Sequence, residues 1–444
     1  MKHLRWIIPL IVTVILLVNS SCSPNHELFD QEVTQAISDS LSPVDSIDPN
    51  HTWVLTDTRT ITVTANANVN AQWLKILTAD PRKSADAEVT TQVMITDGET
   101  AFMSFCYPKT VTTLYAALID DEGRFTVTEF SPNDTKVDFS EPLYSKQIMS
   151  YIPQPQTFVY CYEEEMPDYT HLDFDFNDCV LGIAYERTGE REMRFHVTLS
   201  AVGTNLPMSA ALHLRNFKYD EIDTIYTEGG ASFNVNSKGE DIPEQVISPN
   251  LLRTKELLLK SQSQAKDEDK EAVINLFCDA HWATGDFLPP NDQWLIDHWH
   301  YNVSKTSSSD MTYRTIVPKE VTFIVTFKEA KGLDYLNFDL IDPFIIKEYL
   351  GGTFEVHPFA YRHDWVLKEY KLAEIVKLPW ALVVPYKKFR HPLEGVNIGF
   401  KKKDIQGFGA YSSATGHTFG EWSMSHNLAK DWYLNEYATE NQVY

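Results

Sequence analysis

The sequence predicts a mainly β protein built from two successive β-sandwich domains. Apolar and polar residues alternate with period two over long stretches, and turn residues separate these stretches. The 444 residues correspond to about two or three domains of roughly 150 residues each. With 43% hydrophobic and 23% charged residues, the chain can bury a sizeable core, which excludes collagen-like, coiled-coil and wholly disordered classes.

The first sandwich is predicted over residues 51–140. Ile61 and Val63 alternate with Thr60, Thr62 and Thr64, as expected of strands with one buried face. Further apolar or β-branched runs are 73–77, 89–95, 111–119 and 125–128. About seven short strands in about ninety residues indicate an immunoglobulin-like sandwich, followed by a hinge near 131–134 and 140–142.

A larger, strand-rich domain is predicted over residues 150–444. Val180–Tyr185 and Met193–Val202 are expected to form a hairpin around the turn 187–190. Its buried face would carry Phe195, Val197, Leu199 and Ala201. The segment Leu251–Phe277 is compatible with a helix and is highly charged at its centre, which predicts a surface insertion, partly helical and partly loop.

The N-terminus resembles an export signal. Lys2 and Arg5 precede an apolar run of about thirteen residues, which is short of the roughly 20 needed to span a bilayer. Small polar residues and Cys22 follow, and this arrangement resembles the relaxed lipoboxes of Bacteroidetes lipoproteins. We expect a signal peptide over 1–21, lipidation at Cys22 and a flexible tether over 22–50; a plain cleaved signal peptide is the alternative.

The charge and the cysteines limit the classes of partner and compartment. The net charge of −24 disfavours nucleic acid and an anionic bilayer surface, and it suits hard cations such as calcium. Besides Cys22 there are four cysteines: Cys106, Cys161, Cys179 and Cys278. Buried free thiols are favoured for these, with a bridge between Cys161 and Cys179 as the alternative in an oxidising compartment.

An acidic motif lies near the start of the second domain. Between Lys146 and Arg187 the chain has no lysine or arginine but eight carboxylates. Asp173, Asp175, Asn177 and Asp178 place oxygen ligands at nearly alternate positions, and an extended segment would turn the intervening Phe174 and Phe176 into the core.

Calcium binding would relieve the repulsion within this motif, since calcium takes six to eight oxygen ligands in flexible geometry. The spacing is not that of an EF-hand, because Asp178 stands at the sixth position, where glycine is needed, and Ala184 at the twelfth. An acidic turn whose side chains cap backbone N–H groups is the alternative.

These residues also resemble a known family. The segment Tyr162–Pro167 followed by Asp173–Asp178 is similar to the signature of the LruC domain. The resemblance continues over about 290 residues through Gly203, 342–345, 355–357, 380–385, 391–394 and 431–433. Departures are Cys179, where valine is usual, and Asp342, where asparagine is common.

The resemblance implies a β-sandwich module exported to the envelope, commonly as a lipoprotein, with a calcium site at the acidic signature and no known reaction. The metal ligands it implies are Asp173, Asp175, Asn177 and Asp178, together with Glu163, Glu164 or Glu165.

No catalytic motif is apparent: the sequence lacks G-x-S-x-G, H-E-x-x-H, C-x-x-C and a phosphate loop, so no enzyme is expected. The pair His298 and His300 has the spacing of two metal ligands on a strand, but no third ligand is identifiable nearby. We therefore expect a non-catalytic, surface-exposed outer-membrane lipoprotein with a calcium-stabilised binding or adhesion module for a glycan or a host or envelope protein. A metal-dependent polysaccharide hydrolase and a structural envelope or fimbria-associated subunit are the alternatives.

Overall fold

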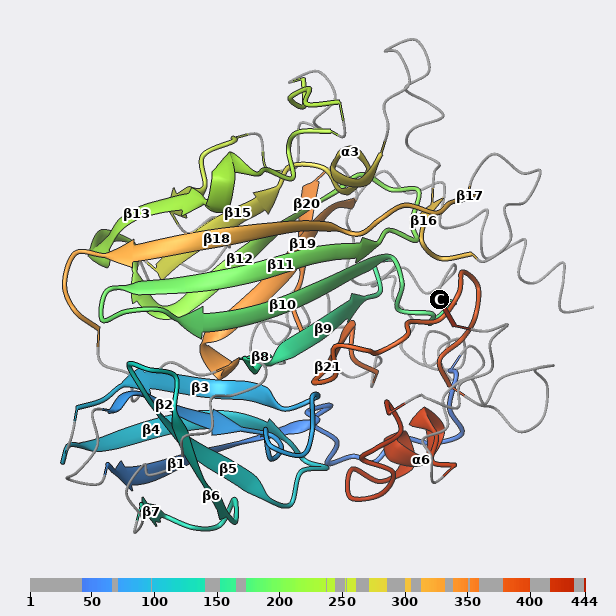
Figure 1. The fold of residues 1–444 in the computed structure, drawn as a ribbon. Coiled ribbons are helices and arrows are strands. Elements are labelled where there is room, and N and C mark those ends of the chain that lie inside the picture. The colour runs from blue at the N-terminus through green and yellow to red at the C-terminus, as the bar shows by residue number, and fades with distance from the viewer. Residues whose placement is uncertain are drawn as a thin grey trace, which may run out of the picture.

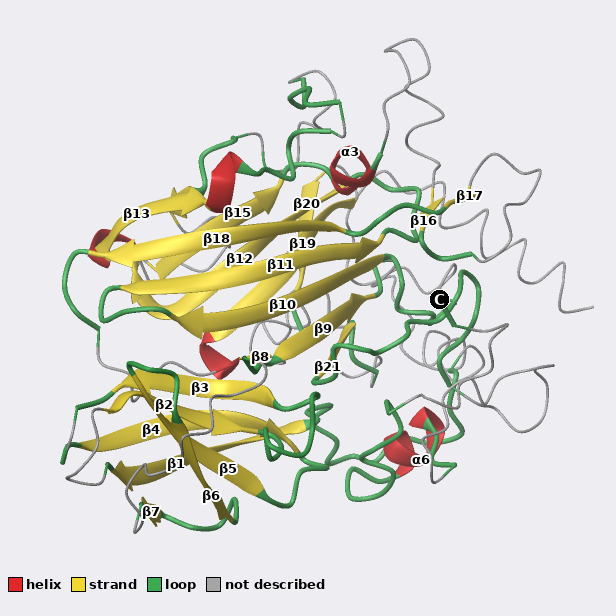
Figure 2. Cartoon of the chain, in the orientation of Figure 1, coloured by secondary structure: helices red, strands yellow, loops and turns green. Residues whose placement is uncertain are grey.

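The structure is a computed structural model. It describes the residues 42–65, 71–96, 98–139, 152–164, 173–236, 238–243, 252, 254–260, 271–285, 300–304, 313–331, 338–349, 352–358, 378–399, 416–434 and 443–444. Strands dominate these residues and the helices are short, so the predicted mainly β class is confirmed (Figure 2).

The first part of the chain folds into two facing sheets (Figure 1). One has the order β4-β1-β7 and the other the order β6-β5-β2-β3-β8. Their strands are β1 (Thr56–Thr64), β2 (Ala71–Leu77), β3 (Glu88–Met94), β4 (Thr100–Pro108), β5 (Leu114–Asp120), β6 (Phe125–Phe130), β7 (Lys136–Asp138) and β8 (Gln154–Pro155). Alternate residues of both sheets, such as Ile61, Phe105, Ile76 and Leu118, pack together between them, which makes this part a sandwich.

The order of these strands differs from that of an immunoglobulin constant domain, in which the first, second, fourth and fifth strands share a sheet. Here β1 lies between β4 and β7 and pairs with β7 in parallel. The short strand β8, which lies inside the range assigned to the second domain, pairs in parallel with β3.

The second part forms a larger sandwich of a six-stranded and a five-stranded sheet, with the orders β13-β18-β11-β10-β9-β21 and β14-β15-β12-β19-β20. A separate pair of short strands, β16 and β17, lies beside them. The strands are β9 (Thr157–Tyr162), β10 (Cys179–Arg187), β11 (Glu192–Ala201), β12 (Met208–Lys218), β13 (Ile222–Thr227), β14 (Leu258–Lys260), β15 (Glu271–Phe277), β16 (His300–Tyr301), β17 (Tyr313–Arg314), β18 (Lys319–Phe327), β19 (Ile341–Tyr349), β20 (Gly352–Val356) and β21 (Ala381–Val384). The helices are α3 (Ala280–Thr284), α6 (Phe419–Met424) and the single-turn 3₁₀ helices η2 (Tyr219–Glu221), η3 (Glu228–Gly230) and η5 (Phe338–Leu340).

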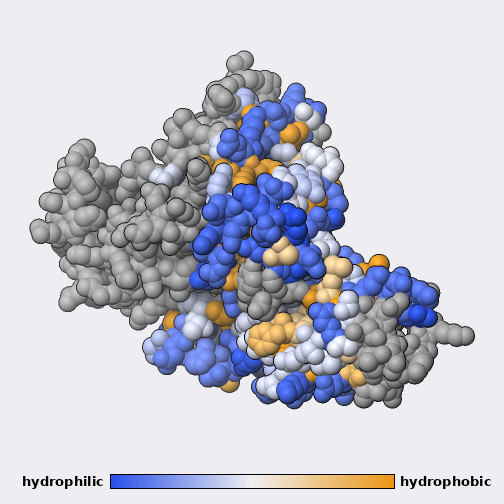
Figure 3. All heavy atoms as spheres, turned by 90° about the vertical axis from the view of Figure 1, so that its left-hand side faces the viewer, coloured by the Kyte–Doolittle hydropathy of each residue, from blue (hydrophilic) through white to orange (hydrophobic). Residues whose placement is uncertain are grey.

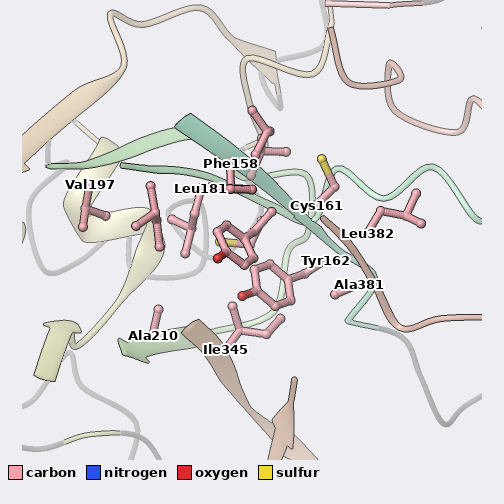
Figure 4. Packing of buried hydrophobic residues seen from close by; sticks show 14 of the residues in the cluster. Phe158, Cys161, Tyr162, Leu181, Val197, Ala210, Ile345, Ala381 and Leu382 are labelled. Carbon is pink, nitrogen blue, oxygen red and sulfur yellow. The ribbon is translucent and has the colours of Figure 1, made fainter. Parts of the chain in front are cut away.

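The main core lies between these two sheets. Phe158, Leu181 and Val197 from the six-stranded sheet meet Ala210 and Ile345 from the five-stranded sheet (Figure 4). The predicted hairpin is confirmed as β10 and β11, and its expected inward residues are buried at every second position of β11. The period-two pattern therefore predicted two of the strands that form the main core.

The predicted helical insertion over Leu251–Phe277 is wrong for the residues that the structure describes. Its ends form β14 and β15, which pair antiparallel, and β15 also pairs with β12. Strand β15 is buried on both faces: Ile274 lies in the main core, and Val273 packs in a second cluster on the outer side with Phe344 and Trp282. A strand covered on both faces has no polar face, so it shows no alternation.

Part of the predicted tether is packed against the folded body. Residues 42–50 lie against the segment 416–434, where the Asp48 N–H donates to the Ser423 carbonyl at 2.8 Å. Val44 is buried in the main core. These residues are therefore not free linker, whereas residues 22–41 and the signal segment lie outside the described part of the chain.

The described surface is mainly hydrophilic on the face shown in Figure 3, with scattered apolar side chains. No helix in the described ranges is long and apolar enough to cross a membrane. Cys106, Cys161, Cys179 and Cys278 are buried free thiols, as predicted.

Candidate metal centre

The acidic motif forms an irregular loop directly before β10. Phe174 and Phe176 have left-handed backbone conformations, with φ of 58° and 53°, so the segment is not the extended strand that was expected. Both rings are buried in the main core, as predicted. Asp175 and Asn177 are also buried, because the curled backbone brings the polar side chains inside as well.

Three of the predicted ligands come together. Glu163 follows β9, and Asp173 and Asp175 precede β10, which is the neighbour of β9 in the sheet. One carboxylate oxygen from each lies within 4.8 Å of the other two. Two ligands on opposite sides of a calcium ion lie at most about 5 Å apart, since each lies roughly 2.3–2.6 Å from the ion. The donor set and its spacing therefore fit a calcium ion.

Burial and mutual repulsion strongly disfavour the ionisation of all the carboxyl groups of this loop at once. Burial and then the charge of Glu394 raise the pKa of Asp173 to about 6. Burial, followed by the charges of Asp173 and Asp178, raises the pKa of Asp175 well above its usual range. The pKa of Asp178 is raised by burial and by Glu164. A divalent cation would remove this repulsion, because it stabilises the ionised form of the carboxylates.

Backbone N–H groups hold the loop in place and connect it to the segment 391–398. The two oxygens of Asp175 accept hydrogen bonds from the N–H groups of Gly395, at 2.8 Å, and Asn177, at 3.1 Å. The Ile398 N–H donates to the Phe174 carbonyl at 2.9 Å. The site is thus assembled from three chain segments: the end of β9, the acidic loop and a segment more than 200 residues further on.

The other predicted ligands have different surroundings. Glu164 forms a buried ion pair with Lys347 at 3.1 Å and accepts a hydrogen bond from the Thr204 hydroxyl at 2.5 Å. Asp178 accepts from the Glu164 N–H at 2.6 Å. The Asn177 amide donates to the Pro392 carbonyl at 3.2 Å, and its buried Oδ1 has no hydrogen-bond partner among the described residues. Glu165 and Cys22 lie outside the described residues.

Glu394 is a carboxylate of this site that the motif analysis did not include. Its charge acts on Asp173, Asp175 and Asp178, and its Oε2 lies 3.4 Å from His300 Nδ1. A signal for it was present in the sequence, because Glu394 ends the run 391–394 on which part of the family resemblance rests. The partner His298 of the H-x-H pair lies outside the described ranges.

Gly203 packs directly against the acidic loop. Its N–H donates to the Asp178 carbonyl at 3.0 Å, and a Cβ added at this position would overlap Asn177 Oδ1 and lie 2.8 Å from the Asn177 carbonyl oxygen. The close approach of the loop therefore requires glycine.

Gly203→Ala is expected to lower the free energy of unfolding by about 1–3 kcal/mol, because the acidic loop must shift to make room for the methyl group. Urea unfolding would measure this. Gly189→Ala is the matched control, since an added Cβ there meets nothing within 4 Å. Equal stability of the two variants would contradict the tight packing of the loop.

Comparisons with known proteins give one structural likeness. No family model and no curated protein matches the chain. It is similar to the crystal structure of a "putative lipoprotein" from Bacteroides ovatus, with 16% identity and a TM-score of 0.46, over 84% of this chain and 99% of that one.

Proposed function

We propose that the protein is an outer-membrane lipoprotein, anchored through Cys22 and exposed at the cell surface, whose LruC-like domain is a non-catalytic, calcium-stabilised module for binding a glycan or an envelope or host protein. The observation that supports the calcium site is the meeting of Glu163, Asp173 and Asp175, with oxygens within 4.8 Å of one another. The anchor rests on the signal-like N-terminus and Cys22.

Glu163, Asp173 and Asp175 would hold the ion, and Glu394, whose charge acts on Asp173 and Asp175, is a further candidate ligand. Calcium supplies a positive charge that neutralises carboxylates and draws their segments together. It would thereby fix the acidic loop against the segment 391–398, which is already joined to the loop by the hydrogen bond from the Gly395 N–H to the Asp175 carboxylate. Since the unfolded chain does not gather these ligands, calcium would bind the folded state preferentially and stabilise it.

A structural role fits this site better than a catalytic one. A catalytic metal keeps an open position for water or substrate at a cleft. Glu163 and Asp175 are each only 1% exposed, and Asp175 is held by backbone donors on both oxygens. We therefore favour an ion that orders the loop over one that activates water.

Calcium is expected to raise the unfolding temperature of the chain from residue 23 onward. At a concentration 100 times the dissociation constant, the stabilisation would be about 2.7 kcal/mol. The measurement is thermal unfolding in millimolar calcium, in millimolar magnesium and in chelator. A variant with both Asp173→Asn and Asp175→Asn should lose the calcium response.

The matched control carries Asp121→Asn and Asp223→Asn, which remove the same charge from two exposed positions. It should respond to calcium as the unchanged protein does. An unchanged protein whose unfolding temperature is the same in calcium and in chelator would rule out the calcium site and leave the motif as an acidic turn.

A further inference from the structure

A half-open groove lies on the outer face of the six-stranded sheet, away from the acidic loop. Its volume is about 230 Å³, and its lining comes from β9, β10, β11 and β18, with Gln154 and Pro155 of β8 at its edge. Strand β8 pairs with β3 of the smaller sandwich and lies between the two sandwiches (Figure 1). The groove therefore lies beside the smaller sandwich.

The groove exists because β10 presents very small residues outward. Gly182 and Ala184 lie in the middle of two cross-strand rows. Gly182 is opposite Thr198, which is opposite Glu320; Ala184 is opposite His196, which is opposite Thr322. The larger side chains on either side of β10 therefore form the walls, and the glycine and alanine form the floor.

Polar side chains, three of them threonines, form the walls. Thr157, Thr198 and Thr322 each offer a group that both donates and accepts hydrogen bonds. The ring of His196 is fixed by the Thr322 hydroxyl at 3.1 Å and by Glu186 at 3.2 Å. Glu320 adds an acceptor and Gln154 an amide.

The charge of the lining selects against several ligand classes. Among the described residues that form it there is one carboxylate, Glu320, and no lysine or arginine, so an anionic ligand is disfavoured. The density of polar groups disfavours a lipid chain, which would leave them without hydrogen bonds. A neutral ligand that is rich in hydroxyl groups matches the walls, and its C–H groups can rest on the small aliphatic floor.

We propose that this groove binds a neutral sugar residue of a glycan. This names the ligand class for the binding role proposed above, but it depends on residues that are separate from the metal centre. The walls recognise hydroxyl groups through the threonines and Glu320, and the Gly182–Ala184 floor admits the ring.

The test is binding of the methyl glycosides of glucose, galactose and mannose to the chain from residue 23 onward, measured by saturation-transfer NMR and titration calorimetry. Gly182→Val should fill the groove and weaken binding at least tenfold. An added Cβ at Gly182 would lie 3.6 Å from Thr198 Cβ and 3.7 Å from Thr157 Cγ2, which is ordinary contact, so the strand can accept a side chain there.

Thr198→Val keeps the shape of the side chain and removes one hydroxyl, so it should weaken binding about 3- to 10-fold. Thr224→Val is the matched control, since Thr224 is exposed on β13 of the same sheet and does not line the groove. It should bind as the unchanged protein does.

Three results would overturn the groove proposal: no binding of any of the three glycosides, full binding by both groove variants, or glucuronate binding as tightly as the neutral sugars. The Asp173→Asn, Asp175→Asn variant should bind the sugars as the unchanged protein does, because its substitutions lie outside the groove. The two proposals are separated in the unchanged protein. There, sugar binding without a calcium-dependent rise in unfolding temperature would retain the groove and reject the metal centre, and a calcium response without sugar binding would do the reverse.

Discussion

Replacing Asp342 with alanine is expected to lower the free energy of unfolding by about 3–5 kcal/mol at pH 7. Asp342 lies in β19 and is fully buried on the outer face of the five-stranded sheet. Its carboxylate lies 3.0 Å from His357 Nδ1 and 3.5 Å from His213 Nδ1. The other ring nitrogens of His357 and His213 lie 3.1 and 2.6 Å from the partly exposed carboxylates of Glu355 and Glu271. The substitution therefore removes the central anion of a row of five titratable groups, of which the middle three are buried.

The same network gives a dependence on pH. Burial alone would lower the pKa of His357, but the charge of Asp342 and the hydrogen bonds to Asp342 and Glu355 raise it to about 9. Because the pKa of His357 is higher in the folded state than in the unfolded state, its protonation stabilises the fold. This stabilisation is fully present below pH 6.5, which is about the pKa in the unfolded chain, and it is lost as the pH rises through about 9. The unfolding free energy should therefore decline by roughly 2–3 kcal/mol between pH 6.5 and 9.5 from this group.

Asp342→Asn tests the predicted pH dependence, because it removes the negative charge and nearly keeps the shape of the side chain. Without the anion, burial should leave His357 neutral, and the loss of stability above pH 6.5 should disappear. Urea unfolding at several pH values gives the free energy of unfolding of both proteins. In the difference between the two curves, titrations of other groups cancel. One such group is Lys319, because burial lowers its pKa to about 8. Parallel curves for the two proteins would contradict the assignment of a charged His357.

The sequence predicted those parts of the fold that have one buried face and one partly exposed face. Strand β11 has this pattern at all ten positions, and the hairpin with β10 followed from it. Strand β15 has no exposed face, and the charged residues before it made the sequence pattern compatible with a helix. The place of β15 beside β12 could therefore not be predicted. The packing of Val44 depends on a surface formed by distant parts of the chain, which local composition does not reveal.

The site was predictable to the extent that its residues are close in sequence. Asp173 and Asp175 belong to one motif, and the adjacent strands β9 and β10 bring Glu163 to them. Glu394 reaches the same place only through the complete fold. The left-handed conformations of Phe174 and Phe176 are uncommon for such residues, so period-two reasoning could not predict the burial of Asp175.

Lys347→Met is expected to destabilise the protein by about 3–5 kcal/mol, because it leaves the carboxylate of Glu164 buried without its cation. Both side chains of this pair are only 3% exposed, and the Lys347 ammonium also donates to the Glu164 carbonyl. Glu164 adjoins Asp178, whose pKa its charge already raises, so an uncompensated Glu164 would add to the repulsion behind the acidic loop. Urea unfolding in calcium and in chelator would measure the loss.

The double variant Lys347→Met, Glu164→Gln should recover most of that loss, since it removes the buried charge together with its partner. Lys388→Met is the matched control: Lys388 pairs with Asp86 at 2.9 Å, but the two side chains are 54% and 66% exposed. Water screens such a pair, so its loss should cost less than about 1 kcal/mol. If Lys347→Met were as mild as Lys388→Met, the Glu164 carboxylate would have to be neutral in the folded protein, which would contradict a charged Glu164–Lys347 pair.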